Sequence, residues 1–240
     1  MKKGKKFIEA LNLIEKDKKY TVSEAVELIE KTKRAKFDET VDIALNLGID
    51  PKQADQQIRM AVNLPHGTGK DVKVLVFANE EKASEATEAG ADFAGLDEYL
   101  EKITGENWLG FDVVIATPDV MSKVGKLGKF LGPRGLMPNP KVGTVTNDIS
   151  EAVKLSKAGR IEIKNDKSGV VHAPIGKVSF GIEKIRENFL SVVNVINRSK
   201  PSSAKGIYLK KITISNTMGP GINIDTADIR ESLKSINAAA

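Results

Sequence analysis

The sequence predicts a mixed α/β protein in which a discontinuous outer domain carries an inserted unit with a parallel sheet. At both ends of the chain, apolar and polar residues alternate with period two, as in half-buried strands. In the middle, short apolar strands alternate with helical segments, which is typical of a parallel sheet covered by helices. Because the terminal strands need partners, we expect them to pair with each other. This gives an outer domain of residues 1–66 and 157–240 and an inserted domain of residues 67–156.

The first part of the chain contains one predicted helix and two predicted strands. Thr21 and Glu24 have the spacing of a capping box, and the apolar residues that follow recur at helical intervals, so a helix is expected over residues 21–34. Residues 40–47 alternate with period two, and residues 58–63 form a second predicted strand.

The central part has the pattern of a parallel α/β unit. Apolar strands are expected over residues 72–78 and 111–116, with a helix over residues 80–89 between them. A further helix begins at Pro118, residues 126–143 read as a long basic loop rich in Gly and Pro, and a helix near 148–157 closes the unit.

The last part returns to alternation. Residues 160–164 and 170–173 flank a turn at 165–169, which predicts a hairpin. An amphipathic helix over 182–196, a strand over 207–214 and a loop over 215–221 follow. Gly residues occur where the chain passes between the two predicted domains, which indicates a hinge.

Composition excludes several classes of protein. The chain has no Cys, so disulfides, Cys-ligated zinc, iron–sulfur clusters and thiol nucleophiles are ruled out. No run of about 18 apolar residues is present, and neither a signal peptide nor a membrane span is expected. The net charge of +5 is uneven: residues 1–66 carry +2, residues 67–156 carry −4, and residues 157–240 carry +7. This distribution favours a polyanion partner for the chain ends.

Sequence signals for an enzyme are incomplete. The segment Gly67-Thr68-Gly69-Lys70 resembles the end of a phosphate loop, but Leu64 and Asp71 stand where that loop needs Gly and Ser or Thr. The glycines of residues 125–132 have the wrong intervals for a dinucleotide site. The two His residues lack metal-ligand spacing, and we expect no catalytic residue, metal or cofactor. An α/β enzyme for a phosphorylated ligand remains the alternative.

Signals for nucleic-acid binding are stronger. Phe37 follows Lys36 just before a strand that starts at Thr40, so an aromatic ring, a cation and a hydroxyl lie close together in sequence. A buried Phe37 would fit the same sequence. The Thr–Met–Gly run at 217–219 offers a hydroxyl, a pliable apolar side chain and a close backbone, although a plain turn is the alternative.

Several motifs resemble one known family. The string FLGPRGLMPNPKVGTV (residues 130–145), preceded by ATPDVM, is similar to the central motif of bacterial large-subunit ribosomal protein L-one, the protein of the mobile stalk beside the tRNA exit site. The strings LPHGTGK, AGADF, KAGRIEIKNDKSGVVHAPIGK and TMGPG also resemble that family, in the same order. The likeness covers about residues 5–228, and nothing is assigned to the residues after Asp228.

The resemblance implies a fold and a function. The fold is an α+β outer domain, with an open antiparallel-rich sheet backed by helices, and an inserted Rossmann-like three-layer α/β domain. The function is that of a cytoplasmic ribonucleoprotein component, monomeric when free. It binds large-subunit rRNA, assists release of deacylated tRNA from the exit site, and represses translation of its own operon by binding the mRNA. A second, weaker RNA contact is expected from the basic segment 123–141, with a merely packed loop as the alternative.

The resemblance also implies a set of RNA-contacting residues in the outer domain. Many relatives have Thr at position 168, where this chain keeps the hydroxyl but not the methyl group. The candidates are Lys36, Phe37, Thr40, Asn165, Asp166, Lys167, Ser168, His172, Thr217, Met218 and Gly219.

Overall fold

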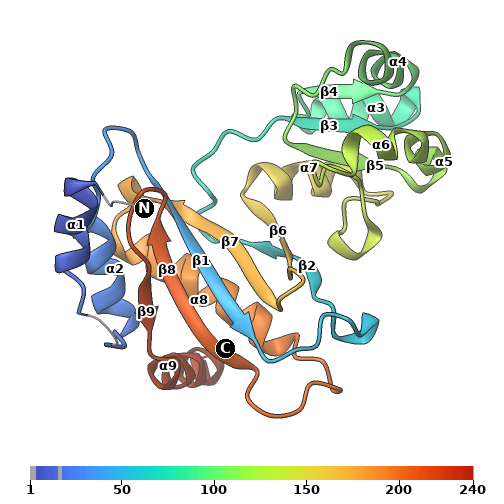
Figure 1. Cartoon of the computed structure of the whole chain (residues 1–240). Coiled ribbons are helices and arrows are strands. Elements are labelled where there is room, and N and C mark those ends of the chain that lie inside the picture. Colours follow the sequence, from blue (N-terminus) through green and yellow to red (C-terminus); the bar gives the residue numbers. More distant parts are fainter. Residues whose placement is uncertain (1–3, 16–17, 240) are drawn as a thin grey trace. The chain divides into compact units, whose positions relative to one another are not determined.

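The computed structural model describes residues 4–15 and 18–239, with side chains as far as Leu233 (Figure 1). Residues 1–3, 16–17 and 240 of the predicted outer domain lie outside the described part. The chain folds into two compact units: Met1–Gly69 with Ile161–Ala240, called the outer unit, and Lys70–Arg160, called the inserted unit. Antiparallel and parallel sheets are combined with helices, so the predicted mixed α/β class is confirmed.

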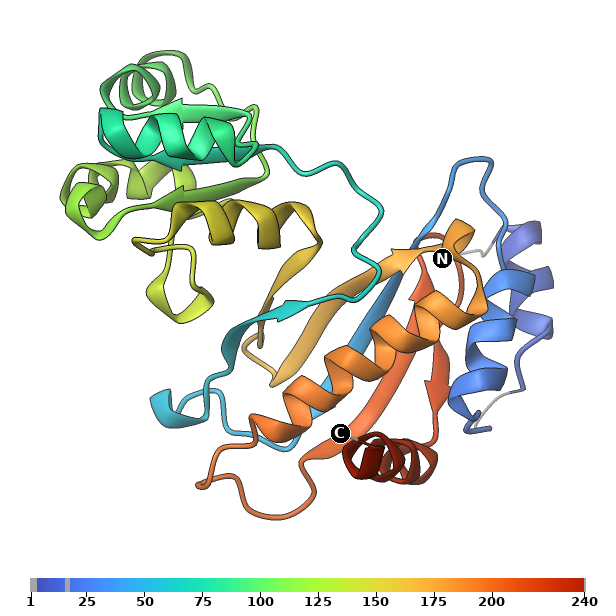
Figure 2. The same ribbon diagram turned by 180° about the vertical axis from the view of Figure 1, so that it is seen from behind.

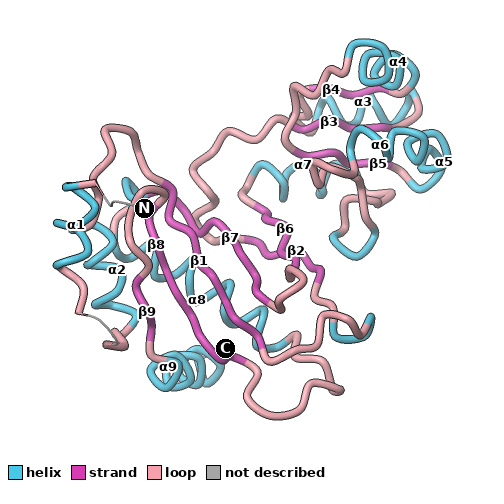
Figure 3. Tube along the Cα trace, in the orientation of Figure 1, coloured by secondary structure: helices cyan, strands magenta, loops and turns pink. Residues whose placement is uncertain are grey.

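The outer unit is built on a four-stranded antiparallel sheet in the order β7-β1-β8-β9 (Figure 3). Strand β1 pairs with β7 from Thr40 opposite Lys177 to Asn46 opposite Val170, and β8 pairs along its other side. The residues of β1 alternate between half-buried and buried, as the period-two pattern predicted. The strands are β1 (Thr40–Leu47), β7 (Val170–Lys177), β8 (Leu209–Asn216) and β9 (Ile222–Ile224).

Helices cover one face of this sheet. Figure 2 shows α8 (Ile182–Arg198) lying across it, and α2 (Val22–Lys31) and α9 (Thr226–Ala239) also belong to this layer. The predicted capping box is present, because Thr21 accepts the Glu24 N–H and Glu24 accepts the Thr21 N–H. No described helix covers the other face, which carries the half-buried side chains of β1. Helices α1 (Lys5–Asn12) and α9 and strand β9 had no predicted counterpart.

The predicted hairpin over residues 160–173 is wrong apart from its turn. Strand β6 (Arg160–Lys164) pairs with β2 (Arg59–Asn63) in a separate two-stranded sheet, while β7 pairs with β1. Only an isolated bridge, Asn165 with Val171, joins the two arms. Alternation shows that a segment is a strand, but it does not identify the strand with which it pairs.

The inserted unit has three layers around a parallel sheet in the order β4-β3-β5. Apolar clusters fill both sides of the sheet, one under α3 and α7 and the other under α4, α5 and α6. Strand β4 and helix α4 were not predicted, since a three-residue strand leaves little periodicity to detect. The elements are β3 (Val74–Phe77), α3 (Glu80–Glu88), β4 (Phe93–Gly95), α4 (Asp97–Glu106), β5 (Val113–Ala116), α5 (Met121–Val124), α6 (Gly128–Leu131) and α7 (Ile149–Lys157).

The long basic loop predicted over residues 126–143 is wrong in its first part. Short helical turns run from Pro118 to Leu131, and Val124, Leu127 and Leu131 are buried at helical spacing. Glycines masked this periodicity. The 3-10 turns of the chain are η1 (Ala54–Gln56), η2 (Pro118–Val120), η3 (Gly125–Leu127), η4 (Pro140–Val142) and η5 (Val178–Phe180).

The chain leaves the outer unit along a segment that is held by one buried amide. Asn188 on α8 accepts the His66 N–H at 3.1 Å and donates to the Gly67 carbonyl at 3.0 Å and the Ile175 carbonyl at 2.8 Å. A Cβ on Gly69, at φ +71°, would lie 2.8 Å from the Phe180 ring. Residues 66–69 are therefore fixed within the outer unit.

Replacing Asn188 with Ala should lower the free energy of unfolding of the outer unit by about 2–4 kcal/mol, because buried backbone groups lose their partners. Urea denaturation measures this change. The matched control is Lys184→Ala on the exposed face of α8, which should shift the midpoint little. Equal midpoints for the two variants would show that the amide contributes nothing specific.

Candidate nucleic-acid interface

The predicted site residues fall into two groups at opposite ends of β1. Lys36, Phe37 and Thr40 lie where β1 begins, beside the loop 217–219 that follows β8. The turn 165–168 precedes β7, whose first residue pairs with Asn46 near the other end of β1. The length of β1, about 23 Å at ~3.3 Å per residue, separates the two groups. His172 lies between them, opposite Ala44.

At the first group, Thr217 is bonded to Thr40 by both its backbone and its side chain. The Thr217 N–H donates to the Thr40 carbonyl at 2.9 Å, and the Thr217 hydroxyl donates to the same carbonyl at 3.1 Å. The hydroxyl also accepts the Thr40 N–H at 3.0 Å. One lone pair of this oxygen is left for a ligand. The main role of the hydroxyl is therefore to hold the loop against β1, and one acceptor position remains for a ligand.

A buried carboxylate joins the two segments of the first group. Glu39 is 0% exposed and accepts the N–H groups of Arg34 at 3.0 Å and Ala35 at 2.7 Å. Its other oxygen accepts the Met218 N–H at 3.1 Å. Burial raises the pKa of Glu39, but the three N–H groups and the nearby Arg34 charge outweigh burial, so the pKa lies below its ordinary value. Glu39 thus remains ionised and holds both loops.

Sequence reasoning missed Glu39, although a signal for it existed. The buried residues of β1 have odd numbers, from Val41 to Leu47, and Glu39 continues that series. A charged residue at an inward position just before a strand needs hydrogen-bond donors around it. The segment before β1 and the loop after β8 supply them.

Two apolar side chains are exposed on the segments that Glu39 joins. Phe37 is 54% exposed and Met218 is 47% exposed. The alternative of a buried Phe37 is therefore wrong. Gly219 closes the loop by donating its N–H to the Asn216 carbonyl at 3.1 Å, and a Cβ there would lie 3.0 Å from the Asn216 side chain.

Two further contacts secure the start of β1. Asp38 accepts the Ser179 hydroxyl at 2.6 Å and the Ser179 N–H at 3.1 Å, and the hydroxyl is the main reason that the pKa of Asp38 is lowered. Lys177 donates to the Thr40 hydroxyl at 3.2 Å. Lys177 is a cation of this region that the sequence had not singled out.

In the second group, the polar residues mostly hold the turn itself. Asp166 accepts the N–H groups of Ser168 at 2.7 Å and Val170 at 2.8 Å, and the Val170 bond is the largest cause of its lowered pKa. Asn165 accepts the Ile58 N–H at 2.7 Å and is buried. The exposed residues of the turn are Asp166, Lys167 and Ser168.

The side chains around this turn form a shallow basic pocket. Its volume is about 310 Å³, and Arg59, Lys164 and Lys167 contribute to its walls. Arg59 is paired with Glu162 at 2.7 Å, which leaves the two lysines as the cations without an ion pair among the described residues. The pocket therefore offers ammonium groups at the far end of β1.

On the open face between the two groups, β1 itself carries small side chains. Asp42, Ala44 and Asn46 of β1 alternate with the buried residues, and Ser215 of β8 lies opposite Asp42. Burial raises the pKa of Asp42, against the opposing effects of His172 and Lys177. Small side chains leave this face accessible to a large ligand along the whole of β1.

The inserted unit does not favour a phosphorylated ligand. A pocket of about 940 Å³ lies where β3 and β4 end, the edge at which open α/β sheets bind nucleotides. Glu80, Glu81 and Asp97 line it, and its Lys123 is paired with Asp97 at 3.0 Å. These carboxylates repel phosphate. Within the described residues, no cluster of His, Asp and Glu is suited to hold a metal ion.

The model of the Ribosomal protein L1p/L10e family matches residues 28–220 of the 240-residue chain, which includes β1, the whole inserted unit and the loop 217–219. The chain belongs to this family. The resemblance seen in the sequence motifs is thereby confirmed.

Membership in this family makes the chain a protein of the large ribosomal subunit. The family consists of structural ribosomal proteins, so the alternative of a phosphate-ligand enzyme is set aside. Among the described helices, none is both long and apolar enough to span a bilayer.

Replacing Glu39 with Gln should lower the free energy of unfolding by about 1–3 kcal/mol at pH 7. The NH2 group of Gln would face a backbone N–H that a carboxylate oxygen accepts in the wild type, and this donor would lose its partner. The folded pKa of Glu39 lies below its ordinary value of 4.5, so the carboxylate stabilises the fold above that pH and ceases to do so as pH falls through the folded pKa. The difference between wild type and variant should therefore shrink in acid.

Urea denaturation at pH 7 and below pH 4 measures this difference. The control is Glu30→Gln on the exposed face of α2, which should unfold as the wild type does at both pH values. A difference that stays constant as the pH falls would contradict the assignment of a charged Glu39.

Proposed function

We propose that the protein binds large-subunit ribosomal RNA through the end of the outer sheet where β1 begins. The observation that carries the proposal is the exposure of Phe37 and Met218 on two loops that Glu39 fixes in place. RNA-binding proteins stack unpaired bases on exposed aromatic rings. A ring held on an ordered loop performs this function at little entropic cost, since the loop need not be ordered on binding.

The charges around these loops support the same proposal. Lys36 is exposed beside Phe37, and Lys177 lies at the start of β1 through its bond to Thr40. Ammonium groups meet phosphates, which fixes the register of the RNA without reading its sequence. The chain ends, at +2 and +7, carry the excess positive charge, whereas residues 67–156 carry −4. The outer unit is therefore the part of the chain that attracts a polyanion.

The open face of the sheet extends the contact toward the turn at 165–168. Carboxylates such as Asp42 cannot bind phosphate, but they accept hydrogen bonds from ribose 2′-hydroxyl groups. His172 and Lys167 lie along the same path. The expected mode is recognition of a folded RNA by shape, by ribose and by phosphate, with stacking at Phe37.

Two further roles rest on the family resemblance. These are the release of deacylated tRNA from the exit site and the repression of the protein's own operon through its mRNA. Repression requires that an mRNA structure of the same shape bind the same surface. The two RNAs should then compete for one site, and a variant that weakens one should weaken the other equally.

Chemical footprinting on total ribosomal RNA tests the proposal. The expected result is protection of one structured region of the large-subunit RNA. A fragment of that region should bind with a preference of ~1000-fold over unrelated RNA at physiological salt, by analogy with sequence-specific DNA binding. Displacement of the fragment by homopolymeric RNA at similar concentration would contradict specific recognition. Competition with a transcript of the operon leader tests repression.

Replacing Phe37 with Ala should weaken binding of the protected fragment by about 1–3 kcal/mol, the usual contribution of one stacked base. Filter binding measures the affinity. The unfolding free energy should change little, because more than half of the side chain is already in solvent. The matched control is Ile207→Ala, which removes an apolar side chain that is 63% exposed elsewhere in the outer unit. Equal affinities of the two variants would remove Phe37 from the interface.

A further inference from the structure

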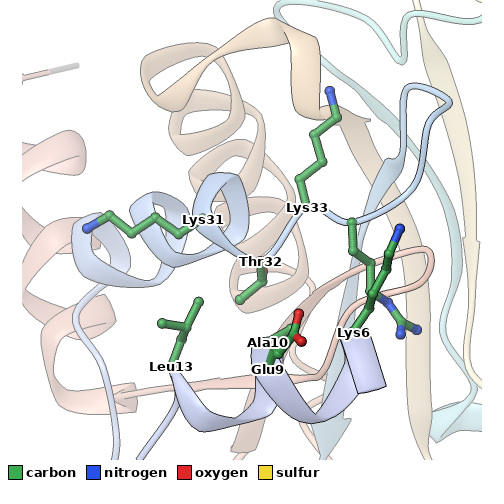
Figure 4. Close-up of a pocket in the computed structure, with 8 residues that line it drawn as sticks. Lys6, Glu9, Ala10, Leu13, Lys31, Thr32 and Lys33 are labelled. Carbon is green, nitrogen blue, oxygen red and sulfur yellow. The ribbon is translucent and has the colours of Figure 1, made fainter. Parts of the chain in front are cut away.

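A basic pocket lies between α1 and the end of α2. Its volume is about 410 Å³, and Arg34 is among its lining residues. Figure 4 shows Lys6 and Glu9 on α1, with Lys31 and Lys33 on the chain at and just after the end of α2. Four cations and one carboxylate thus border the same hollow. None of the residues from α1 belongs to the predicted set of RNA contacts.

The cations of the pocket are poorly neutralised. Lys6 and Lys33 form no ion pair with a described residue, and Lys31 pairs with Glu27 only at 3.9 Å on an exposed surface. The charges of Lys33 and Arg34 also act on Asp38 and Glu39, whose pKa values they help to lower. The carbonyl groups at the end of α2 attract cations and offset part of their charge. A net excess of positive side chains nevertheless remains, which favours an anionic ligand.

Arg34 connects this pocket with the proposed RNA site. Its guanidinium group lies 4.8 Å from the centre of the Phe7 ring, and its Nε is buried without a hydrogen-bond partner among the described residues. Its backbone N–H donates to Glu39, which also holds the Met218 loop. From Lys33 to Phe37 the chain spans at most ~14 Å. A strand of RNA that is stacked at Phe37 and runs toward α1 would therefore come within reach of the pocket.

The spacing of the cations fits a chain of phosphates better than a single anion. Figure 4 shows the side chains of Lys31 and Lys33 leaving the end of α2 in different directions, with Lys6 on the opposite helix. A single phosphate is best held by donors that converge on one point, as in a bidentate arginine pair. Separated ammonium groups act as point charges along a polyanion.

We propose that this pocket binds backbone phosphates of the RNA strand that continues from the site at Phe37 and Met218. The inference rests on the proposed function and extends it to α1, which precedes the family match at residues 28–220. Phosphate contacts carry no sequence information, so the pocket raises affinity and fixes the path of the strand without choosing the RNA.

The test is the salt dependence of binding to the rRNA fragment defined by footprinting. The double variant Lys6→Ala/Lys33→Ala should reduce the slope of log affinity against log salt by about 1.4–1.8, since each phosphate contact contributes about 0.7–0.9. Between 50 and 200 mM salt the variant should therefore lose about tenfold less affinity than wild type. Its preference for the fragment over unrelated RNA should stay unchanged.

Two controls make the result specific. The double variant Lys184→Ala/Arg186→Ala removes two exposed charges from α8, on the covered face of the sheet, and should keep the wild-type slope. Glu9→Gln removes the carboxylate of the pocket and should tighten binding by about twofold to threefold at low salt, an effect that screening abolishes at high salt.

The possible outcomes separate the two proposals. If wild-type protein shows no preference for the fragment, the proposed function fails. If wild type shows the preference but the Lys6/Lys33 variant keeps the full slope, the phosphate assignment is wrong while the function stands. Loss of binding to polyglutamate by that variant, with an unchanged RNA slope, would assign the pocket to an acidic protein segment and overturn the inference.

Discussion

The architecture of the proposed interface depends on one buried charge. Glu39 sits at the inward-facing position just before β1 and is kept ionised by three backbone N–H groups from two different loops. A buried carboxylate without hydrogen-bond donors would destabilise the fold. Moving either loop away from Glu39 would remove such donors, so the buried charge keeps both loops in position. The exposed side chains of Phe37 and Met218 are therefore carried on backbone segments that this buried contact holds in place.

The two units differ in the sign of their net charge. The chain ends carry the positive excess, and their cations gather at both ends of β1 and beside α1. The inserted unit places carboxylates at the edge where its fold class normally binds phosphate. In other proteins this fold class binds nucleotides, but here Glu80, Glu81 and Asp97 make the corresponding edge unfavourable for phosphate. Function is therefore determined by the residues of the site and not by the fold.

Local patterns predicted much of the outer unit, while contacts between distant segments escaped them. The capping box at Thr21 and the alternation of β1 need only neighbours in sequence, and both are present. Strand β6 pairs with β2, and beside this pair Asn165 bonds to Ile58, more than 100 residues away; no periodicity in the sequence identifies such a partner. At the site, the sequence identified Phe37 as a candidate contact but could not decide whether its ring is exposed. It did not distinguish Glu39 from the other acidic residues of the chain.

The pairing of β2 with β6 has a consequence for how the outer unit accommodates the insertion. These strands lead out of the outer unit and back into it, and they lie side by side in its small second sheet. Asn188 in addition holds the segment that follows β2, through its hydrogen bonds to His66 and Gly67. The 91 residues from Lys70 to Arg160 form the inserted unit. Because the bonds of Asn188 lie within the outer unit, we expect substitutions in the inserted unit to leave them in place.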